Sequence, residues 1–229
     1  MLNAVAASSF TYISHPLVLT LCQNGTIIIM LTLCQYDLRI GEVLALKKNV
    51  GPLLALYPMP VTVIGAMNKE KPTWTLVAHV GIIGHDRVLV SLAAPHFMNG
   101  CIKREKKLSI NLVDEAMLQD AAYVGSVSGA KTDKSAVFDY DMGDAGAPII
   151  RRSPLTMECS VADVYPTPNF ESFICTIDNT YVSDKHLDQE GHIDYGTLKP
   201  VLFEFPTYQY LKTGEVLGAC LSFKKTPEK

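Results

Sequence analysis

Apolar runs of strand length follow one another between residues 61 and 113. Three of them, at residues 61–66, 76–83 and 88–93, are rich in Val, Ile or Leu and end at Gly, Pro, Asn or Asp, which is typical of β-strands. The connections at residues 67–72 and 84–86 are short and polar. Because a parallel return needs a crossover of about a dozen residues or more, these connections favour antiparallel neighbours. A meander of this kind can close into a small barrel with a ligand at its rim.

The rest of the chain continues this mainly β pattern and adds some helix. Residues 108–113 alternate apolar and polar side chains as a strand does, and residues 114–123 are rich in helix formers. Residues 187–198 form a polar, acidic excursion. The pattern also predicts helices at 101–107 and 134–140, and strands at 155–165, 173–183, 202–205 and 216–223. We therefore expect an α+β fold, mainly β: an antiparallel barrel that begins at Val61 and has flanking helices.

Residues 1–46 do not match this pattern. Their two apolar segments, 17–22 and 26–34, are separated by Gln23-Asn24-Gly25, whereas a spanning helix needs about 20 apolar residues in a row. No Lys or Arg precedes Arg39, although a signal peptide begins with positive charge. Three readings stay open: a poorly ordered tail, an extra hairpin on the barrel, or translation from a start codon placed too early. We predict a non-catalytic extension at 1–46, one domain at 47–229, and no membrane association.

Composition narrows the class of protein. The chain has 229 residues, 48% of them hydrophobic and 19% charged, which is enough to bury a substantial core. The formal net charge is −3 and the only dense positive run is at 103–107, so we expect no nucleic-acid partner. The six cysteines form no CxxC pair, which favours reduced thiols in a cytoplasmic protein; Cys101 is the one we single out. His79 and His85 lack a third ligand at suggestive spacing, so we expect no metal site.

Two segments carry candidate binding chemistry. Thr73-Trp74-Thr75 follows Pro72, and hydroxyls and backbone N–H groups at a strand end can bind the edge of a flat heteroaromatic ring; the alternative is that Trp74 is simply core. The segment 125–132, GSVSGAKT, is near the phosphate loop GxxxxGK[ST], but Ala130 replaces a glycine and a predicted helix precedes it, so we do not expect nucleotide hydrolysis. A lysine here could bind a ligand phosphate, or could merely pair on the surface.

An ordered series of motifs resembles the flavin reductase-like, flavoredoxin-type family. The series runs through YPMPV at 57–61, PTWT at 72–75, Ser91-Leu92, residues 96–102, Asn111, and GSVSGAKTDKSAVF at 125–138. The resemblance covers roughly residues 49–225. It implies an FMN-binding split β-barrel that usually forms a homodimer.

The resemblance also implies roles for particular residues. The strand at 73–76 would lie along the flavin ring, and the region after Ser91 would hold the phosphate or ribityl chain. Met98 stands where the family commonly has Thr, and Asn99 could supply a substitute donor. A lone histidine such as His96 is otherwise a helix-capping or core residue. The predicted cofactor-binding residues are Thr73, Trp74, Thr75, Leu76, Ser91, His96, Asn99, Lys131 and Lys134, and we expect Thr73, Ser91 and His96 to face one cavity.

The function implied is that of an FMN-dependent oxidoreductase. It would pass electrons from NAD(P)H or a protein donor to flavin, ferric iron, a disulfide or a redox protein partner. We expect no catalytic acid or base, because the cofactor carries the electron transfer. The sequence lacks the GxGxxG fingerprint, which leaves open an FMN-binding electron carrier without its own NAD(P)H activity. A weaker alternative is a barrel that binds haem or a pyridoxal-type phosphate. Tyr208 and Tyr210 could stack on a flavin, seal a dimer interface or pack in the core.

Overall fold

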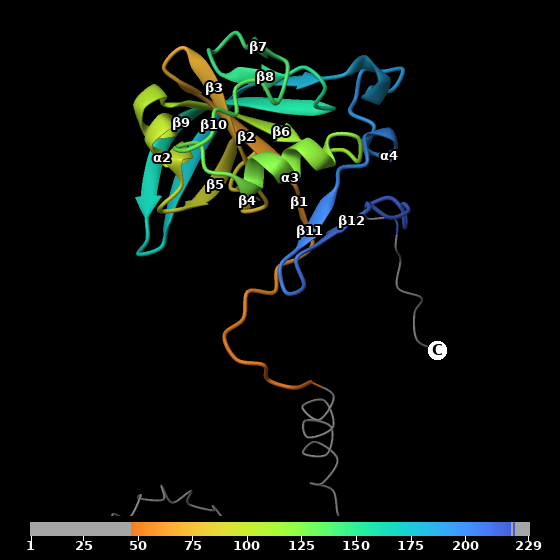
Figure 1. The fold of residues 1–229 in the computed structure, drawn as a ribbon. Coiled ribbons are helices and arrows are strands. Elements are labelled where there is room, and N and C mark those ends of the chain that lie inside the picture. The colour runs from red at the N-terminus through yellow and green to blue at the C-terminus, as the bar shows by residue number, and fades with distance from the viewer. Residues whose placement is uncertain (1–46, 221, 223–229) are drawn as a thin grey trace, which may run out of the picture. The chain divides into compact units, whose positions relative to one another are not determined.

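A seven-stranded antiparallel sheet is the largest part of the fold (Figure 1). The computed structural model describes residues 47–220 and 222, and the predictions for residues 1–46 lie outside this range. Residues 47–54 have no helix or strand, and the elements below all lie in the unit that begins at Ala55. The sheet consists of β2 (Thr62–Asn68), β3 (Lys71–Val77), β4 (Val80–Ile82), β5 (Arg87–Ala93), β6 (Lys107–Leu112), β9 (Leu155–Pro166) and β10 (Phe170–Val182), in the order β3-β2-β6-β9-β10-β5-β4.

Two smaller sheets and short helices complete this unit. The short strand β1 (Met59–Pro60) pairs with β11 (Leu202–Glu204), and β11 pairs with β12 (Gln209–Leu211). A hairpin consists of β7 (Tyr140–Met142) and β8 (Pro148–Ile150). The helices are α2 (Phe97–Glu105), α3 (Leu118–Ser126), α4 (Tyr195–Leu198) and the 3-10 turn η1 (Asp184–His186). No helix of the described residues is long and apolar enough to cross a membrane.

The order of the strands requires the large sheet to curl. β3 and β4 are its two edge strands, yet only Ala78 and His79 separate them in the chain. Two residues cannot cross the width of a flat seven-stranded sheet, whose strands lie about 4.8 Å apart. The two edges therefore have to come together, as they do in a barrel. The apolar run at 76–83, which we expected to be one strand, is split at this point because its two halves pair with different partners.

The other predicted elements are confirmed in part. The strands expected at 108–113, 155–165, 173–183 and 202–205 correspond to β6, β9, β10 and β11. The helix expected at 101–107 overlaps α2, which begins earlier and ends at Glu105. The helix expected from residue 114 begins at Leu118, because the Asp114 carboxylate first accepts a hydrogen bond from the Met117 backbone N–H in a turn. The first strand of the large sheet, β2, begins at Thr62, one residue after the start predicted at Val61, and the preceding β1 belongs to a separate sheet.

Two predicted elements were wrong. Residues 134–139 form turns instead of a helix, and the backbone N–H of Ser135 is held by the Asp133 carboxylate. No strand forms at residues 216–220, whose apolar side chains Val216 and Leu217 are exposed, and the last strand is the shorter β12.

Two apolar clusters hold the helices against the sheet. The first contains Met98, Cys101 and Ile102 of α2 with buried side chains of β2, β5, β6 and β10. The second contains Ala121 and Val124 of α3 with the ring of Trp74. That ring is fully buried and passes over Gly65, where any side chain would collide with it. These contacts fix helix α3 against β3. They therefore also fix the position at which the loop after α3 begins.

A buried carboxylate braces the β7–β8 hairpin. Glu158 on β9 accepts hydrogen bonds from the backbone N–H groups of Ala145 and Ala147, from the Asn179 amide and from the Tyr181 hydroxyl, at 2.8–3.1 Å. Burial alone would raise the pKa of Glu158, but these four hydrogen bonds outweigh it and leave the pKa below its ordinary value.

Candidate functional site

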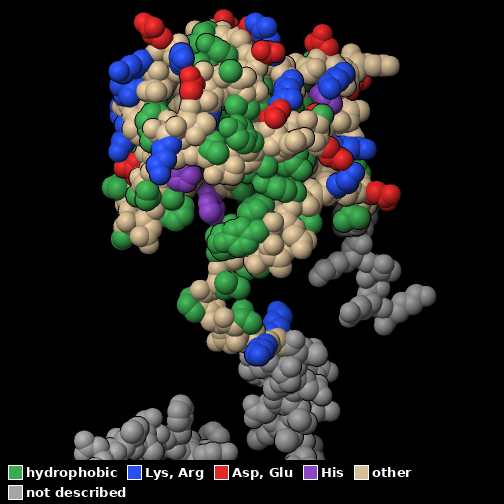
Figure 2. All heavy atoms as spheres, in the orientation of Figure 1, with side chains coloured by type: hydrophobic (Ala, Val, Ile, Leu, Met, Phe, Trp, Pro, Cys, Tyr) green, Lys and Arg blue, Asp and Glu red, His purple; other side chains and the backbone are tan. Residues whose placement is uncertain are grey.

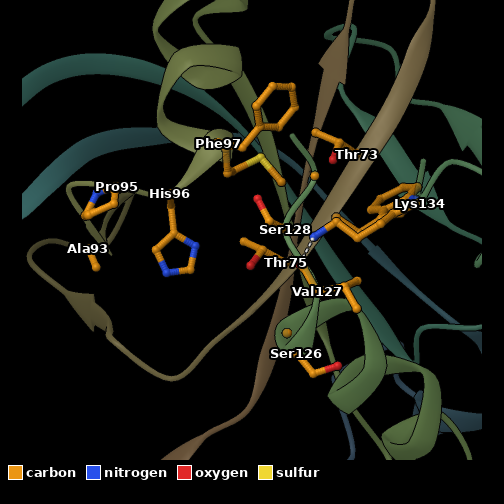
Figure 3. Close-up of a pocket in the computed structure, with 14 residues that line it drawn as sticks. Thr73, Thr75, Ala93, Pro95, His96, Phe97, Ser126, Val127, Ser128 and Lys134 are labelled. Carbon is orange, nitrogen blue, oxygen red and sulfur yellow. Dashed lines mark hydrogen bonds between the residues drawn. The ribbon is translucent and has the colours of Figure 1, made fainter. Parts of the chain in front are cut away.

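A cavity of about 320 Å³ lies where β3, the start of α2 and the chain after α3 meet (Figure 3). We call it the first cavity. Its size is at the lower end of the range for small-molecule sites. Its walls are Thr73, Trp74 and Thr75 of β3, Ala93 at the end of β5, Pro95, His96, Phe97 and Met98 around the start of α2, Gly125 and Ser126 at the end of α3, and Val127, Ser128, Gly129 and Lys134 after α3.

Hydrogen bonds and close contacts fix the two loops that line the first cavity. Asn99 is buried and its amide nitrogen donates to the backbone carbonyls of Ala93 and Ala94, which holds the turn leading to His96. The opposite loop approaches so closely that a Cβ on Gly129 would lie 2.8 Å from Phe97 Cδ1 and 3.0 Å from Thr73 Oγ1. Only glycine permits this approach without movement of a neighbour.

Lys134 is a buried cation on the wall of the first cavity. Its side chain is 4% exposed, and its Nζ donates to the backbone carbonyls of Val124 and Val127 at 2.9 and 3.1 Å. No carboxylate of the described residues forms a salt bridge with it. Burial lowers the pKa of Lys134 from its ordinary value. An ammonium has three donors, so one remains for a ligand, and a buried cation without an acidic partner favours an anionic one.

His96 lies on the other side of the same cavity (Figure 3). It is the N-cap residue of α2, but its ring makes no capping hydrogen bond, so the helix-capping role considered for it is wrong. Loss of hydration and the nearby charge of Lys134 lower the pKa of His96. The imidazole is therefore neutral at neutral pH, with both a donor and an acceptor nitrogen. The hydroxyls of Thr73, Thr75 and Ser128 add further donors to the lining.

The structure brings together some of the predicted residues. Thr73, Thr75, His96 and Lys134 all line the first cavity. Trp74 lines it too, but its ring packs edge-on against Phe138, with centroids 5.7 Å apart, in the apolar cluster. The core role that the sequence left open for the Trp74 ring is therefore what the structure has.

Four predicted residues lie elsewhere. Leu76 and Ser91 line a neighbouring cavity, where the Ser91 hydroxyl is 2.7 Å from that of Ser172. Asn99 lies behind the wall, as a brace. Lys131 is exposed and lines a third, polar hollow beside Asp133, which itself pairs with Lys71 at 2.9 Å. The single cavity expected for Thr73, Ser91 and His96 is thus two cavities, because Thr73 and Ser91 belong to different strands that do not pair.

The neighbouring cavity, which we call the second cavity, measures about 270 Å³. It shares Ala93 and His96 with the first cavity. The rest of its lining is mostly apolar: Val61, Leu76, Val77, Ala78, His79, Ser91, Leu92, Phe170, Phe203, Phe205 and Tyr208.

Several lining residues were not predicted. Ser128 and Gly129 belong to the GSVSGAKT segment, whose small polar residues marked it as a loop without showing which of them face a cavity. Pro95 and Phe97 flank His96 in the same motif. Cys101 lines neither cavity: it is buried on α2, and burial raises the pKa of its thiol.

A surface group of Asp188, Glu190 and His192 has three possible ligand atoms within 4.8 Å of one another. All three side chains are exposed, and the Asp188 carboxylate accepts hydrogen bonds from the backbone N–H groups of the other two residues. The Asp188 carboxylate therefore already stabilises the turn that contains these three residues.

An antiparallel sheet curled until its edges meet, with flanking helices and a cavity at its rim, defines the class of the split β-barrels. A model of the family described as flavin reductase like domain matches residues 54–212. The chain belongs to this family.

Solved structures agree with this assignment. Flavoredoxin from Methanosarcina acetivorans is 28% identical with a TM-score of 0.73, over 77% of this chain and 96% of that one. Flavoredoxin of Desulfovibrio vulgaris is 25% identical with a TM-score of 0.71, over 77% and 98%. An FMN-binding protein from Thermus thermophilus, at 19% identity over 76% and 98% with a TM-score of 0.64, shares the fold. The comparison with curated proteins gives no match.

Proposed function

We propose that this chain binds FMN in the first cavity and is an oxidoreductase of the flavin reductase and flavoredoxin type. The observation that carries the proposal is Lys134, a buried ammonium on the cavity wall with no acidic partner among the residues described. A charge of this kind is costly unless a ligand anion pairs with it. The FMN phosphate is such an anion, and membership of the family supports the choice.

The residues of the first cavity fit the parts of FMN. The third donor of Lys134, the Ser128 hydroxyl and the neutral imidazole of His96 would hold the phosphate and ribityl end. β3 is an edge strand, so every second residue presents backbone N–H and C=O groups that no strand partner takes up. Together with the hydroxyls of Thr73 and Thr75, these groups would hold the edge of the ring.

When bound, FMN supplies the electron transfer. The protein's part is to position the ring and to set its polar surroundings. The side chains that line the first cavity include no carboxylate or thiol, which is consistent with a site that needs no acid or base of that kind.

The identities of the electron donor and acceptor are a separate proposal, which depends on FMN binding. We propose NAD(P)H or a protein donor, with flavin, ferric iron, a disulfide or a redox protein as acceptor. The absence of a GxGxxG fingerprint leaves open the alternative of an FMN-binding electron carrier without its own NAD(P)H activity. The homodimer and the cytoplasmic location stay predictions.

Spectroscopy of the purified protein tests the proposal. We expect a flavin absorption band either as isolated or after incubation with FMN. FMN at 100 times its Kd should add about 2.7 kcal/mol to the free energy of unfolding, which a thermal melt detects. Protein that stays colourless and gains no stability from FMN would contradict the proposal. Anaerobic addition of NADH or NADPH to the FMN form then separates the two activities: bleaching indicates a reductase, and no bleaching indicates a carrier.

A further inference from the structure

The second cavity has the walls of a site for a flat apolar molecule. Aromatic rings contribute much of its lining: Phe170 at the start of β10, Phe203 on β11, and Phe205 and Tyr208 in the turn before β12. Figure 2 shows histidine side chains, in purple, beside a hollow on this face, next to a group of hydrophobic side chains in green. Flat rings stack on or pack edge-on against aromatic walls of this kind.

The second cavity holds no charged side chain. Its polar lining side chains are Ser91, His79, His96 and Tyr208, and the Ser91 hydroxyl is already bonded to Ser172. A charged ligand would lose its hydration here without gaining a partner of opposite charge. The lining therefore selects an uncharged ligand.

The imidazole of His79 is held in place in this apolar setting. Its Nε2 lies 3.1 Å from the Tyr57 hydroxyl, and its ring is edge-on to Phe170 with centroids 5.7 Å apart. Tyr57 is fixed in turn by stacking on Phe205, with centroids 6.0 Å apart and planes at 15°. Burial, and then the neighbouring Tyr208, raise the pKa of Tyr57, so its hydroxyl keeps its proton and can donate it to Nε2.

The Tyr57–His79 hydrogen bond is compatible with either tautomer of the imidazole, and the ligand contact proposed below requires the one in which the Tyr57 hydroxyl donates to Nε2. The proton of the neutral ring is then on Nδ1, which can donate a hydrogen bond. Nδ1 has no hydrogen-bond partner within the part of the chain that the structure describes. An oriented N–H donor in a mostly apolar cavity matches an uncharged ligand that carries a hydrogen-bond acceptor, such as a carbonyl oxygen.

We propose that the second cavity binds an uncharged planar aromatic compound with carbonyl oxygens, of the quinone class, and that His79 donates a hydrogen bond to one of these oxygens. The walls that the two cavities share, Ala93 and His96, place this compound next to the first cavity. Its role as electron acceptor rests on the proposed function. Reduced FMN would then give two electrons and two protons to the quinone, leaving oxidised FMN and the hydroquinone.

The binding itself is tested without flavin. Equilibrium dialysis of flavin-free protein compares 2,3-dimethyl-1,4-naphthoquinone with 2,3-dimethylnaphthalene, which has the same rings and no oxygen. Both ring positions that thiols attack are blocked in this quinone, so exposed Cys220 does not react with it. The measured quantity is the ratio of the quinone affinity to the hydrocarbon affinity, because the quinone carbonyls lose hydration that the hydrocarbon does not have; one hydrogen bond from His79 should raise this ratio about 3- to 10-fold.

Two variants test whether His79 is the source of this hydrogen bond. His79→Phe keeps a ring and removes the donor, so its ratio of quinone to hydrocarbon affinity should be about 3- to 10-fold lower than that of the wild type. His85→Phe makes the same exchange at an exposed histidine outside both cavities and should keep the wild-type ratio. Thermal melts show that both variants are folded. An affinity ratio that is unchanged in His79→Phe, or no binding of either ligand by the wild type, would overturn the inference.

The two proposals fail in different ways. Protein that binds FMN but not the quinone leaves the proposed function standing and removes this inference. Protein that binds the quinone through His79 but not FMN supports the binding site and removes its redox role.

Discussion

Replacing Lys134 by methionine separates the phosphate contact from the rest of the proposed flavin site. Methionine has a similar length and no charge, so the variant removes the cation with little change in volume. FMN and riboflavin differ only by the phosphate, and each is measured on the wild type and on Lys134→Met. The comparison of the four Kd values isolates the interaction between this ammonium and the phosphate.

The hydrogen bonds of Lys134 in the structure determine how much FMN affinity the variant should lose. Two donors of Lys134 bind the carbonyls of Val124 and Val127, which leaves one for the phosphate. A hydrogen bond to a charged group contributes about 1.5–3 kcal/mol, and 1.4 kcal/mol is a factor of ten in Kd. We therefore expect Lys134→Met to weaken FMN binding by about 10- to 150-fold and riboflavin binding by less than about 3-fold.

Quenching of flavin fluorescence gives the four Kd values, at a temperature where thermal melts show both proteins folded. Lys131→Met is the matched control, because it removes a lysine of the same segment that is exposed and outside the first cavity. We expect it to change FMN binding by less than about 3-fold. An equal loss of FMN and riboflavin binding in Lys134→Met, or a larger FMN effect in Lys131→Met, would refute the reasoning.

Three further predictions concern stability and titration. Gly129→Ala crowds two side chains of the cavity and should lower the free energy of unfolding by about 1–3 kcal/mol in chemical denaturation. Gly100→Ala, which has open space on α2, should raise it by about 0.5–1 kcal/mol. Equal effects of the two variants would contradict the crowding at Gly129. The pKa of Glu158 is lowered, so its stabilisation is complete above the unfolded pKa of about 4.3 and is lost as pH falls through the folded pKa; the acid loss of stability should be shallower in Glu158→Gln. By NMR, His96 should titrate below about 6.5, and its pKa should rise in Lys134→Met; no rise would remove the proposed effect of the Lys134 charge.

Alternation and turn residues predicted most strands of this fold, because period-two burial is a local property. They did not predict the break at Ala78 and His79, since a continuous apolar run carries no sign of which partner each half will have. β1 contains Pro60 and has only two residues, so its pairing with β11 depends on tertiary contact.

The sequence motifs predicted several polar residues of the site, but they did not predict which of these residues share a cavity. His96 and Lys134 were marked by their motifs, and they do face one cavity. Ser91 was assigned to the same cavity because the family resemblance included the region around it, yet its strand pairs with β10 and its hydroxyl faces Ser172. The burial of Lys134 could not be read from a segment that is otherwise polar, because it results from the packing of α3 on β3.

A crystal structure of the protein with FMN tests the central claim most directly. We expect the phosphate within hydrogen-bond distance of Lys134 Nζ, and the flavin ring along Thr73 and Thr75 of β3. FMN bound with its phosphate away from Lys134, or bound outside the first cavity, would contradict the account.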